Sequence, residues 1–251
     1  MERWVGKVAL VTGASAGIGA AITENLVKDG LKVVAVARRV ERIEEINEKL
    51  KGAKGELHAK RCDLTKEEDI LEVFRWIKEN LGGVDVLVNN AGMLVPGPLT
   101  GGETEGFKRM LDINVLAVAI ATREAVRSMK ERQIPGHIFN INSVAGHYIG
   151  SPNNVVSLYP ATKFAVTAMS EVTRKELVLA GTRIKITSIS PGGVKTEFIS
   201  STGVEVFTPE RLKSIPLLNP EDVANAVSYA LGTPEHVQVC ELTIRPVGES
   251  F

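Results

Sequence analysis

The segment TGASAGIG, residues 12–19, follows a short apolar run and precedes a helix-forming stretch that begins Ala20-Ala21-Ile22. Glycines at this spacing permit a tight turn, close approach of backbone N–H groups to a pyrophosphate, and close packing of a helix on a strand. Taken alone the segment is weak evidence, because ordinary turns also collect small residues. Its place between a first strand and a first helix favours binding of a dinucleotide.

Short runs of β-branched residues recur along the rest of the chain, with helix-length segments between them. This alternation is typical of parallel strands joined by crossover helices. The sequence therefore predicts an α/β fold of the Rossmann type: a doubly wound, parallel, seven-stranded sheet with helices on both faces, a three-layer sandwich. The predicted strands are Lys7–Val11, Lys32–Ala37, Glu56–Arg61, Val84–Val88, His137–Ile141, Lys185–Ile189 and Glu241–Arg245.

Helix starts and loops complete this outline. Residues 65–68, Thr-Lys-Glu-Glu, match a capping box that opens a helix towards Leu81, and Pro220 opens the last helix. No repeat, low-complexity tract or linker divides the chain, so we expect one domain over residues 1–251. The long irregular stretch at about residues 192–219 is expected to form a lid over the site.

Composition excludes several classes of protein. The 251 residues include 30 Lys and Arg and 30 Asp and Glu, and this balance argues against nucleic acid as a partner. We expect no membrane span, because no apolar run approaches the roughly 20 residues that one needs. Cys62 and Cys240 lie far apart and the four histidines are scattered, so we expect no metal site and a reduced, cytoplasmic setting.

The end of the second predicted strand bears on the choice of cofactor. A carboxylate that accepts the ribose hydroxyls of NAD would lie here, but the sequence reads Val36-Ala37-Arg38-Arg39. A guanidinium can pair with the 2′-phosphate of NADP, which a carboxylate would repel. The two arginines therefore favour NADP, although they would also suit a solvated start to the next helix. Asp63, which ends the third strand, could accept from an adenine amino group or help to cap the following helix.

Four more segments fall where strands end or a helix begins: Asn89-Asn90-Ala91-Gly92, Asn142-Ser143, Pro191-Gly192-Gly193-Val194 and Tyr159-Pro160-Ala161-Thr162-Lys163. In an open α/β sheet the ligand crevice lies at the carboxyl ends of the strands, so we expect these segments to converge. Together with residues 12–19, and in this order, they resemble the short-chain dehydrogenases/reductases over essentially the whole chain. Segments such as Cys62-Asp63-Leu64 and Gly146-His147 resemble the branch that contains insect farnesol dehydrogenases and vertebrate 17β/3-ketosteroid reductases of the dehydrogenase/reductase member 11 type.

The chemistry of such an enzyme can be followed from single residues. Reduction of a carbonyl needs a proton on oxygen besides the hydride, and Tyr159 is the expected donor. The ordinary pKa of a phenol, about 10, is too high for efficient proton transfer near neutrality, so we expect the ammonium of Lys163, four residues on, to stabilise the phenolate. Pro160 disfavours helical dihedrals at the residue before it, which places Tyr159 at or beside the N-cap.

The resemblance implies a catalytic tetrad of Asn114, Ser143, Tyr159 and Lys163. Ser143 would hold the substrate oxygen, and Asn114 would bind a proton-relay water that links to Lys163, although each residue type is also common as a turn serine or a core amide. By the same resemblance the cofactor contacts would be Gly13, Ser15, Gly17, Ile18, Gly19, Arg38, Arg39, Glu44, Asp63, Leu64, Asn90, Ala91, Gly92, Tyr159, Lys163, Pro191, Gly192, Val194 and Thr196.

The expected substrate is a small hydrophobic alcohol or carbonyl compound. The loop His147–Asn154, between Ser143 and Tyr159, is expected to form one wall of the pocket, which apolar neighbours would complete. These are Met93, Val95, Ala145, Leu158, Phe198, Ile199 and Phe207. Farnesol-like alcohols are the first expectation and ketosteroids the second, and an NADPH-binding sensor or scaffold without turnover is the alternative outside enzymes. The resemblance also implies a homodimer or homotetramer built on the helices near Phe107–Lys130 and Pro160–Ala180.

Overall fold

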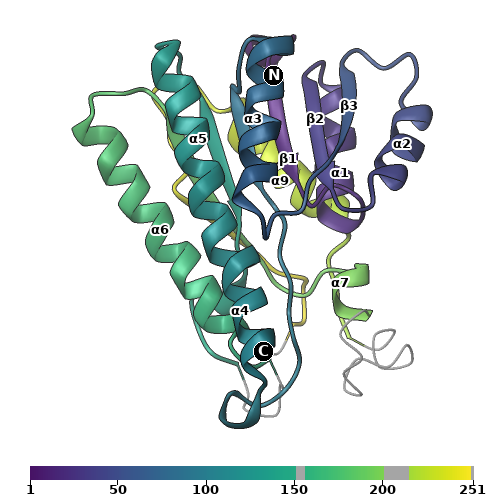
Figure 1. Ribbon diagram of the computed structural model, residues 1–251, viewed down its shortest axis with the longest axis vertical. Coiled ribbons are helices and arrows are strands. Elements are labelled where there is room, and N and C mark those ends of the chain that lie inside the picture. Colours follow the sequence, from purple (N-terminus) through teal and green to yellow (C-terminus); the bar gives the residue numbers. More distant parts are fainter. Residues whose placement is uncertain (151–155, 201–214, 250–251) are drawn as a thin grey trace.

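The computed structural model describes residues 1–150, 156–200 and 215–249, and within it seven parallel strands form one sheet (Figure 1). The strand order is β3-β2-β1-β4-β5-β6-β7. Successive strands are added to one side of β1 as far as β3 and then, from β4 on, to its other side, which confirms the predicted doubly wound sheet. The strands are β1 Val8–Thr12, β2 Lys32–Ala37, β3 Glu56–Arg61, β4 Val86–Asn89, β5 His137–Ile141, β6 Lys185–Pro191 and β7 Glu241–Ile244.

Helices cover both faces of this sheet. They are α1 Gly17–Lys28, α2 Val40–Lys49, α3 Glu67–Leu81, α4 Thr104–Leu111, α5 Ala117–Glu131, α6 Tyr159–Leu179, α7 Glu197–Ser200 and α9 Pro220–Gly232. Helices α1, α2 and α9 pack on one face, and α3, α5 and α6 pack on the other (Figure 1).

The alternation of side chains along each strand divides the core into two layers. In β1, Ala9 and Val11 join the layer under α1 and α9, whereas Val8 and Leu10 join the layer under α3 and α5. Every residue of β1 is buried, as expected for a strand of a parallel sheet that is covered on both faces. Burial on both faces fixes the register of the strands, and with it the edge at which their carboxyl ends meet.

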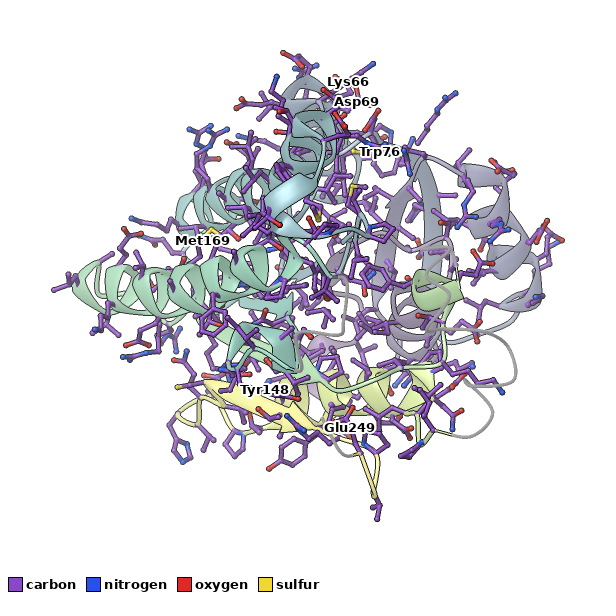
Figure 2. All side chains as sticks on the ribbon, turned by 90° about the horizontal axis from the view of Figure 1, so that it is seen from below. Lys66, Asp69, Trp76, Tyr148, Met169 and Glu249 are labelled. Carbon is purple, nitrogen blue, oxygen red and sulfur yellow. The ribbon has the colours of Figure 1, made fainter. Side chains whose placement is uncertain are left out.

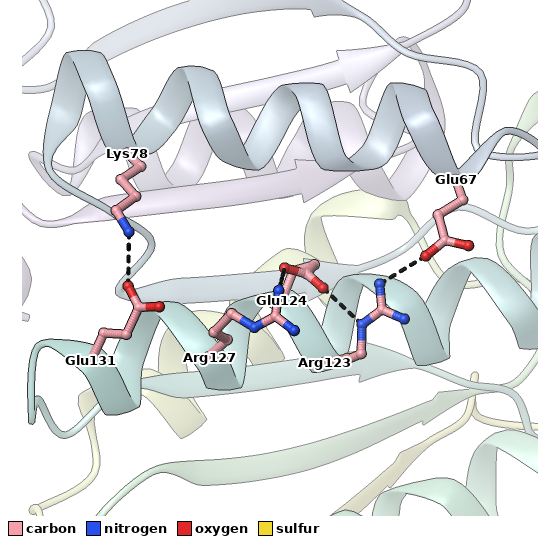
Figure 3. Close-up of polar contacts among 6 residues, drawn as sticks. All are labelled: Glu67, Lys78, Arg123, Glu124, Arg127 and Glu131. Carbon is pink, nitrogen blue, oxygen red and sulfur yellow. Dashed lines mark hydrogen bonds and ion pairs between the residues drawn. The ribbon is translucent and has the colours of Figure 1, made fainter.

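Ion pairs join the outer surfaces of α3 and α5 (Figure 3). Lys78 pairs with Glu131 at 2.9 Å, and Arg123 pairs with Glu67 at 2.8 Å. Exposed pairs of this kind contribute little to the free energy of unfolding. The buried apolar layer between the two helices and the sheet therefore carries most of the stability of this face.

One local prediction was wrong. The capping box at residues 65–68 does not form, because the Asp63 carboxylate accepts from both the backbone N–H and the hydroxyl of Thr65, and α3 begins at Glu67. The chain is helical near Phe107–Lys130 as expected, but a π-helical turn, η3 Asp112–Leu116, joins the end of α4 at Leu111 to α5. Helix α9 begins at Pro220 as predicted, and Asp222 accepts from the backbone N–H of Asn219 at 2.8 Å.

No helix in the described part of the chain is long and apolar enough to cross a membrane. Within the same residues, no group of three or more His, Cys, Asp or Glu side chains could hold a metal ion. Cys62 and Cys240 are both free thiols, the first buried and the second exposed.

Candidate active site

A cavity of about 1580 Å³ lies at the carboxyl ends of the strands and brings the predicted segments together. Most of the expected site residues line it: Gly13, Ser15, Gly17, Ile18, Arg38, Arg39, Asp63, Leu64, Asn90, Ala91, Gly92, Ser143, Tyr159, Lys163, Pro191, Gly192, Val194 and Thr196. Of the others, Glu44 lies on α2, while Gly19 and Asn114 stand behind the lining and are described below. The convergence follows from sheet topology, since these segments are far apart in sequence.

The glycine-rich turn between β1 and α1 is packed against the segment after β4. Gly13 has a φ of +65°, and a Cβ there would lie 2.8 Å from Cα of Ala91. A Cβ on Gly19 would lie 2.4 Å from Nδ2 of Asn90, so this glycine serves close packing although it does not line the cavity. The Asn90 amide donates to the carbonyl of Thr12 at 2.9 Å and holds the turn in place.

The residues around this turn fit the phosphates of a dinucleotide. The N-cap of α1 is Ala16, whose side chain cannot accept from the first backbone N–H groups of the helix. These N–H groups and the positive end of the helix dipole suit an anion. Thr12 supports the arrangement from behind, because its hydroxyl accepts from the backbone N–H of Asn90 at 3.0 Å and of Ala91 at 3.1 Å. Sequence reasoning gave Thr12 no role of its own.

Arginines occupy the far end of the cavity, after β2. Both Arg38 and Arg39 are exposed and line it. The carboxylate of Glu197, on α7, pairs with Arg39 at 3.2 Å and with Arg42 at 2.7 Å. These guanidinium groups therefore already hold an anionic group at this end of the site.

Asp63 lies beside these arginines at the end of β3. Burial opposes ionisation of its carboxyl, but hydrogen bonds from Thr65 and the charge of Arg38 outweigh burial and lower its pKa. The ionised carboxylate accepts hydrogen bonds in the turn before α3 and also lines the cavity. Both roles that the sequence left open for Asp63 are thus compatible with its position.

Tyr159 is the first residue of α6, directly after the N-cap Leu158, which agrees with the position inferred from Pro160. Its ring packs against Phe198 with the ring centroids 5.8 Å apart. Burial raises the pKa of Tyr159 to about 12, although a hydrogen bond with Ser143 acts in the opposite direction. At neutral pH the phenol therefore carries its proton.

Lys163 lies one helical turn after Tyr159, and its side chain is buried. Its Nζ donates to the carbonyl of Ile141 at 2.9 Å and lies 5.7 Å from the ring centroid of Tyr159. Burial lowers the pKa of Lys163 to about 8. The expected lowering of the phenol pKa by this ammonium is not seen at that separation, where desolvation of the phenol dominates.

Ser143 and Asn114 approach the same region from other elements. Ser143 follows β5, and its Oγ accepts from the backbone N–H of Ala145 at 3.1 Å. Asn114 is buried in η3, where its amide accepts from the N–H of Met93 and donates to the carbonyl of the same residue, each at 2.8 Å. Its Nδ2 also donates to the hydroxyl of Thr162 at 3.0 Å, which ties it to α6.

Gly92 separates Asn114 from Lys163. A Cβ on this glycine would lie 3.6 Å from Oδ1 of Asn114 and 3.9 Å from Nζ of Lys163. The amide and the ammonium thus flank one small space at the wall of the cavity. The relay water expected at Asn114 stays a prediction that this arrangement accommodates.

The wall around Tyr159 is mainly apolar. Of the expected pocket residues, Met93, Ala145, Leu158 and Phe198 line the cavity and Val95 does not. Tyr148 and the exposed Ile149 also line it, from the segment after β5. Phe207, the side chain of Ile199, residues 151–154 of the predicted wall and residues 201–214 of the predicted lid lie outside the described part of the structure. The described ends of the predicted lid meet where Val194 pairs with Leu218.

We expect a Lys163→Met variant to lose activity and to become more stable than the parent protein at neutral pH. In the folded protein the pKa of Lys163 is about 8 against an ordinary 10.5, so between these values the unfolded chain binds more protons than the folded chain. The stability of the parent therefore rises with pH across this window, and the advantage of the variant shrinks. Thermal unfolding at a series of pH values measures the difference.

The matched control for this variant is Lys175→Met, because the ammonium of Lys175 lies on the same helix and is already 66% exposed to water. The control should show no comparable gain at neutral pH. A gain for Lys163→Met that stays constant from pH 7 to pH 11 would contradict the assigned burial cost.

Comparisons with known proteins agree with this geometry. The family model "short chain dehydrogenase" matches residues 7–205. A farnesol dehydrogenase of Aedes aegypti is 51% identical over 254 aligned positions, covering 100% of both chains, and human dehydrogenase/reductase SDR family member 11 is 49% identical, covering 98% of this chain and 96% of its own.

Solved structures give the same result. An alcohol dehydrogenase from the archaeon Thermococcus sibiricus, complexed with 5-hydroxy-NADP, has a TM-score of 0.85 and 30% identity, covering 97% of this chain and 98% of its own. A closed form of serine dehydrogenase complexed with NADP+ has a TM-score of 0.84 and 34% identity, covering 97% of this chain and 96% of its own. By its sequence, its sheet and its full-length relatives, this chain belongs to the short-chain dehydrogenase/reductase family of oxidoreductases.

Proposed function

We propose that this protein is an NADP-dependent oxidoreductase that interconverts a hydrophobic alcohol and its aldehyde or ketone, with a farnesol-like isoprenoid alcohol as substrate. The observation that carries the proposal is that Ser143, Tyr159 and the buried ammonium of Lys163 line one cavity with an apolar wall. When bound, the nicotinamide supplies the acceptor or donor of hydride.

The protein's own residues supply the rest of the chemistry. Ser143 holds the oxygen of the substrate by its hydroxyl, and Tyr159 gives its phenolic proton to that oxygen in reduction and takes it back in oxidation. Lys163 provides a positive charge near the phenolate that forms in reduction, and its lowered pKa allows it to exchange protons near neutrality. Asn114 holds the segment at Met93 beside this group through two backbone hydrogen bonds.

The choice of NADP rests on charge at the end of β2. Arg38 and Arg39 line the cavity, and Arg39 already pairs with a carboxylate of the same chain. A 2′-phosphate carries two charges where a carboxylate carries one, and it accepts a forked pair of hydrogen bonds. Two of the solved structures named above are complexes with NADP+ or an NADP derivative, which supports the same choice.

The isoprenoid substrate rests on the lining of the cavity and on the relatives. Met93, Leu158 and Phe198 present apolar surface to the cavity that Tyr159 also lines, and such surface suits a long hydrocarbon chain better than a charged one. The Aedes aegypti relative is named a farnesol dehydrogenase. The buried ammonium of Lys163 argues against a binding module without turnover, because a site that only bound a dinucleotide would not need so costly a group.

The proposal also includes a homodimer or homotetramer in a reduced, cytoplasmic setting. Exposed apolar side chains lie on η3 and α6, within the helices through which the resemblance implies a contact between subunits: Leu116 is 54% exposed, Val172 54% and Leu179 88%. Apolar surface of this kind is typical of an interface.

A panel of alcohols and carbonyl compounds tests the proposed reaction, with NADP or NADPH followed by nicotinamide absorbance. We expect farnesol and related isoprenoid alcohols to have the highest kcat/KM, with steroid ketones as the second class. Serine is the polar control, because a relative with 34% identity is a serine dehydrogenase. Tight NADPH binding without turnover of any compound would favour a sensor or scaffold instead.

A further inference from the structure

The carboxyl group of Glu249, near the end of the chain, is buried against the loop that follows β6. Its side chain is only 1% exposed, and its Oε1 accepts from the backbone N–H of Gly193 at 2.8 Å. A buried carboxylate is expensive unless hydrogen bonds and a nearby charge satisfy it.

The fit between Glu249 and the loop is tight at Gly192. A Cβ on Gly192 would lie 2.4 Å from Oε1 and 2.6 Å from Oε2 of Glu249, closer than real Cβ atoms come. Its backbone is not in the left-handed region, so nothing in its dihedral angles requires glycine. A side chain at Gly192 would therefore require the Glu249 carboxylate to move from its present position.

Backbone hydrogen bonds bring the tail back to this loop. The N–H of Gly192 donates to the carbonyl of Ile244 at 2.8 Å, which continues the pairing of β6 with β7. Beyond β7 the chain turns, and the N–H of Glu249 donates to the carbonyl of Pro246 at 3.2 Å. The turn includes Gly248 at a φ of +88°, a conformation that favours glycine. The last described residues therefore form a turn that brings Glu249 back to the loop after β6.

A second contact links Glu249 to the segment after β5, which also lines the cavity. Oε2 of Glu249 pairs with the guanidinium of Arg245 at 3.2 Å, and this guanidinium lies 4.8 Å from the ring centroid of Tyr148. Figure 2 labels Tyr148 and Glu249, which lie near each other beside β7. Tyr148 lines the cavity from the segment after β5 that precedes Tyr159 in the chain. One carboxylate thus touches the loop after β6 directly and the substrate wall through an arginine.

We propose that Glu249 is a positioning residue, which fixes the Gly192–Gly193 backbone against the nicotinamide end of the cofactor and, through Arg245, sets the position of Tyr148. This inference rests on the proposed function, because it needs a cofactor with its nicotinamide near Tyr159. Gly192 and Gly193 line the same cavity as Ser143 and Tyr159, and β6 pairs with β5, from which Ser143 follows. Movement of this loop would change the distance between the nicotinamide and the substrate carbon.

Two substitutions separate the hydrogen bond from the charge. In Glu249→Ala both are lost, and we expect kcat to fall by about 10- to 100-fold, because a displacement of about 1 Å in a hydride donor has an effect of that size. In Glu249→Gln the amide oxygen still accepts from Gly193, so kcat should recover most of this loss, while KM for the alcohol rises because the ion pair that links Glu249 to Arg245 and Tyr148 is lost. Val247→Ala, at a side chain that is 99% exposed on the same tail, is the matched control.

The primary deuterium isotope effect on kcat provides a readout that simple instability would not move. We expect it to increase in Glu249→Ala, because hydride transfer limits the rate more strongly when its geometry is poor. A variant with unchanged kcat, KM and isotope effect, or one whose loss of activity follows only from loss of folded protein, would overturn the proposal.

A double-mutant cycle with Gly192→Ala tests the same contact without relying on one variant. In the parent background the new methyl group collides with Glu249, so NADPH affinity and the melting temperature should both fall. In the Glu249→Ala background the space is free, and the same substitution should cost much less. Additive effects of the two substitutions would show that the carboxylate does not set the position of the loop.

The readouts also distinguish a failure of the proposed function from a failure of the positioning role of Glu249. If the parent protein turns over no alcohol, the proposed function fails, but NADPH binding and the fluorescence of its reduced nicotinamide still report on the loop. We then expect Glu249→Ala to change that fluorescence and weaken binding, whereas Val247→Ala does not. Identical fluorescence and affinity in the parent and Glu249→Ala would overturn the positioning role alone.

Discussion

Replacement of Tyr159 by phenylalanine should lower kcat by about 100- to 10,000-fold, the range that proton transfer by a positioned side chain contributes. The variant keeps the ring that packs on Phe198 and loses only the hydroxyl that bonds to Ser143. Binding of NADPH should therefore change little, because the ring still fills its place on the wall. Nicotinamide absorbance measures turnover, and fluorescence titration measures the dissociation constant.

The chain offers a matched control for this variant. Tyr229 lies on α9, is 64% exposed and does not line the cavity, so Tyr229→Phe removes a phenolic hydroxyl without touching the site. It should have the activity of the parent protein. Substantial turnover in Tyr159→Phe, at a level near that of Tyr229→Phe, would rule out Tyr159 as the proton donor.

The second large effect concerns the cofactor. Arg38→Asp should raise the dissociation constant of NADPH by about 10- to 100-fold or more, since a hydrogen bond to a charged group contributes about 1.5–3 kcal/mol and the new carboxylate also repels the 2′-phosphate. The dissociation constant of NADH, which lacks this phosphate, should change far less. Parallel titrations with the two reduced cofactors measure the ratio, and an equal loss for both would remove the 2′-phosphate from this end of the cavity.

A substitution at Glu197 should have the opposite effect on NADPH binding. Its carboxylate pairs with Arg39 and Arg42, where it competes with a phosphate for the same cations. Glu197→Gln should therefore bind NADPH more tightly than the parent protein, with the gain shrinking at high salt. The control for Arg38→Asp is Arg75→Asp, which adds the same negative charge at a residue that is exposed on α3 and does not line the cavity. Arg75→Asp should leave the ratio of the dissociation constants of NADPH and NADH unchanged.

The sheet and most of the site could be predicted because they depend on repeated, local signals. Alternating apolar residues set the strands, and parallel strands bring their carboxyl ends to one edge, so residues as distant as Gly13 and Tyr159 had to meet there. Strand boundaries in the structure differ from the predicted ones by about two residues at most, as expected for ends that fray. The place of Tyr159 at the start of α6 followed from one local restraint, the proline after it.

Other features depend on competition or on long-range contacts that no pattern announces. The capping box at Thr65 failed because Asp63, two residues earlier, accepts from the backbone N–H of Thr65 and also takes its hydroxyl as a donor, whereas in a capping box that hydroxyl would accept. The link between Glu249 and Gly193 joins two polar stretches at opposite ends of the last third of the chain, and neither has a periodic pattern that would reveal it. Glu44 was expected at the cofactor only by resemblance, and its place on α2 leaves that expectation as a prediction.

The π-helical turn at Asp112–Leu116 has a consequence for how this site can vary. Each residue of an α-helix turns the chain by about 100°, so one residue more or fewer in this segment would rotate Asn114 relative to α5 and point its amide away from Met93 and Thr162. The direction of this side chain is therefore set by a count of residues as well as by their identity. Insertion or deletion of one residue in this segment would do more harm than most substitutions. A redesign that replaced the π-helical turn by regular α-helix would lose the site.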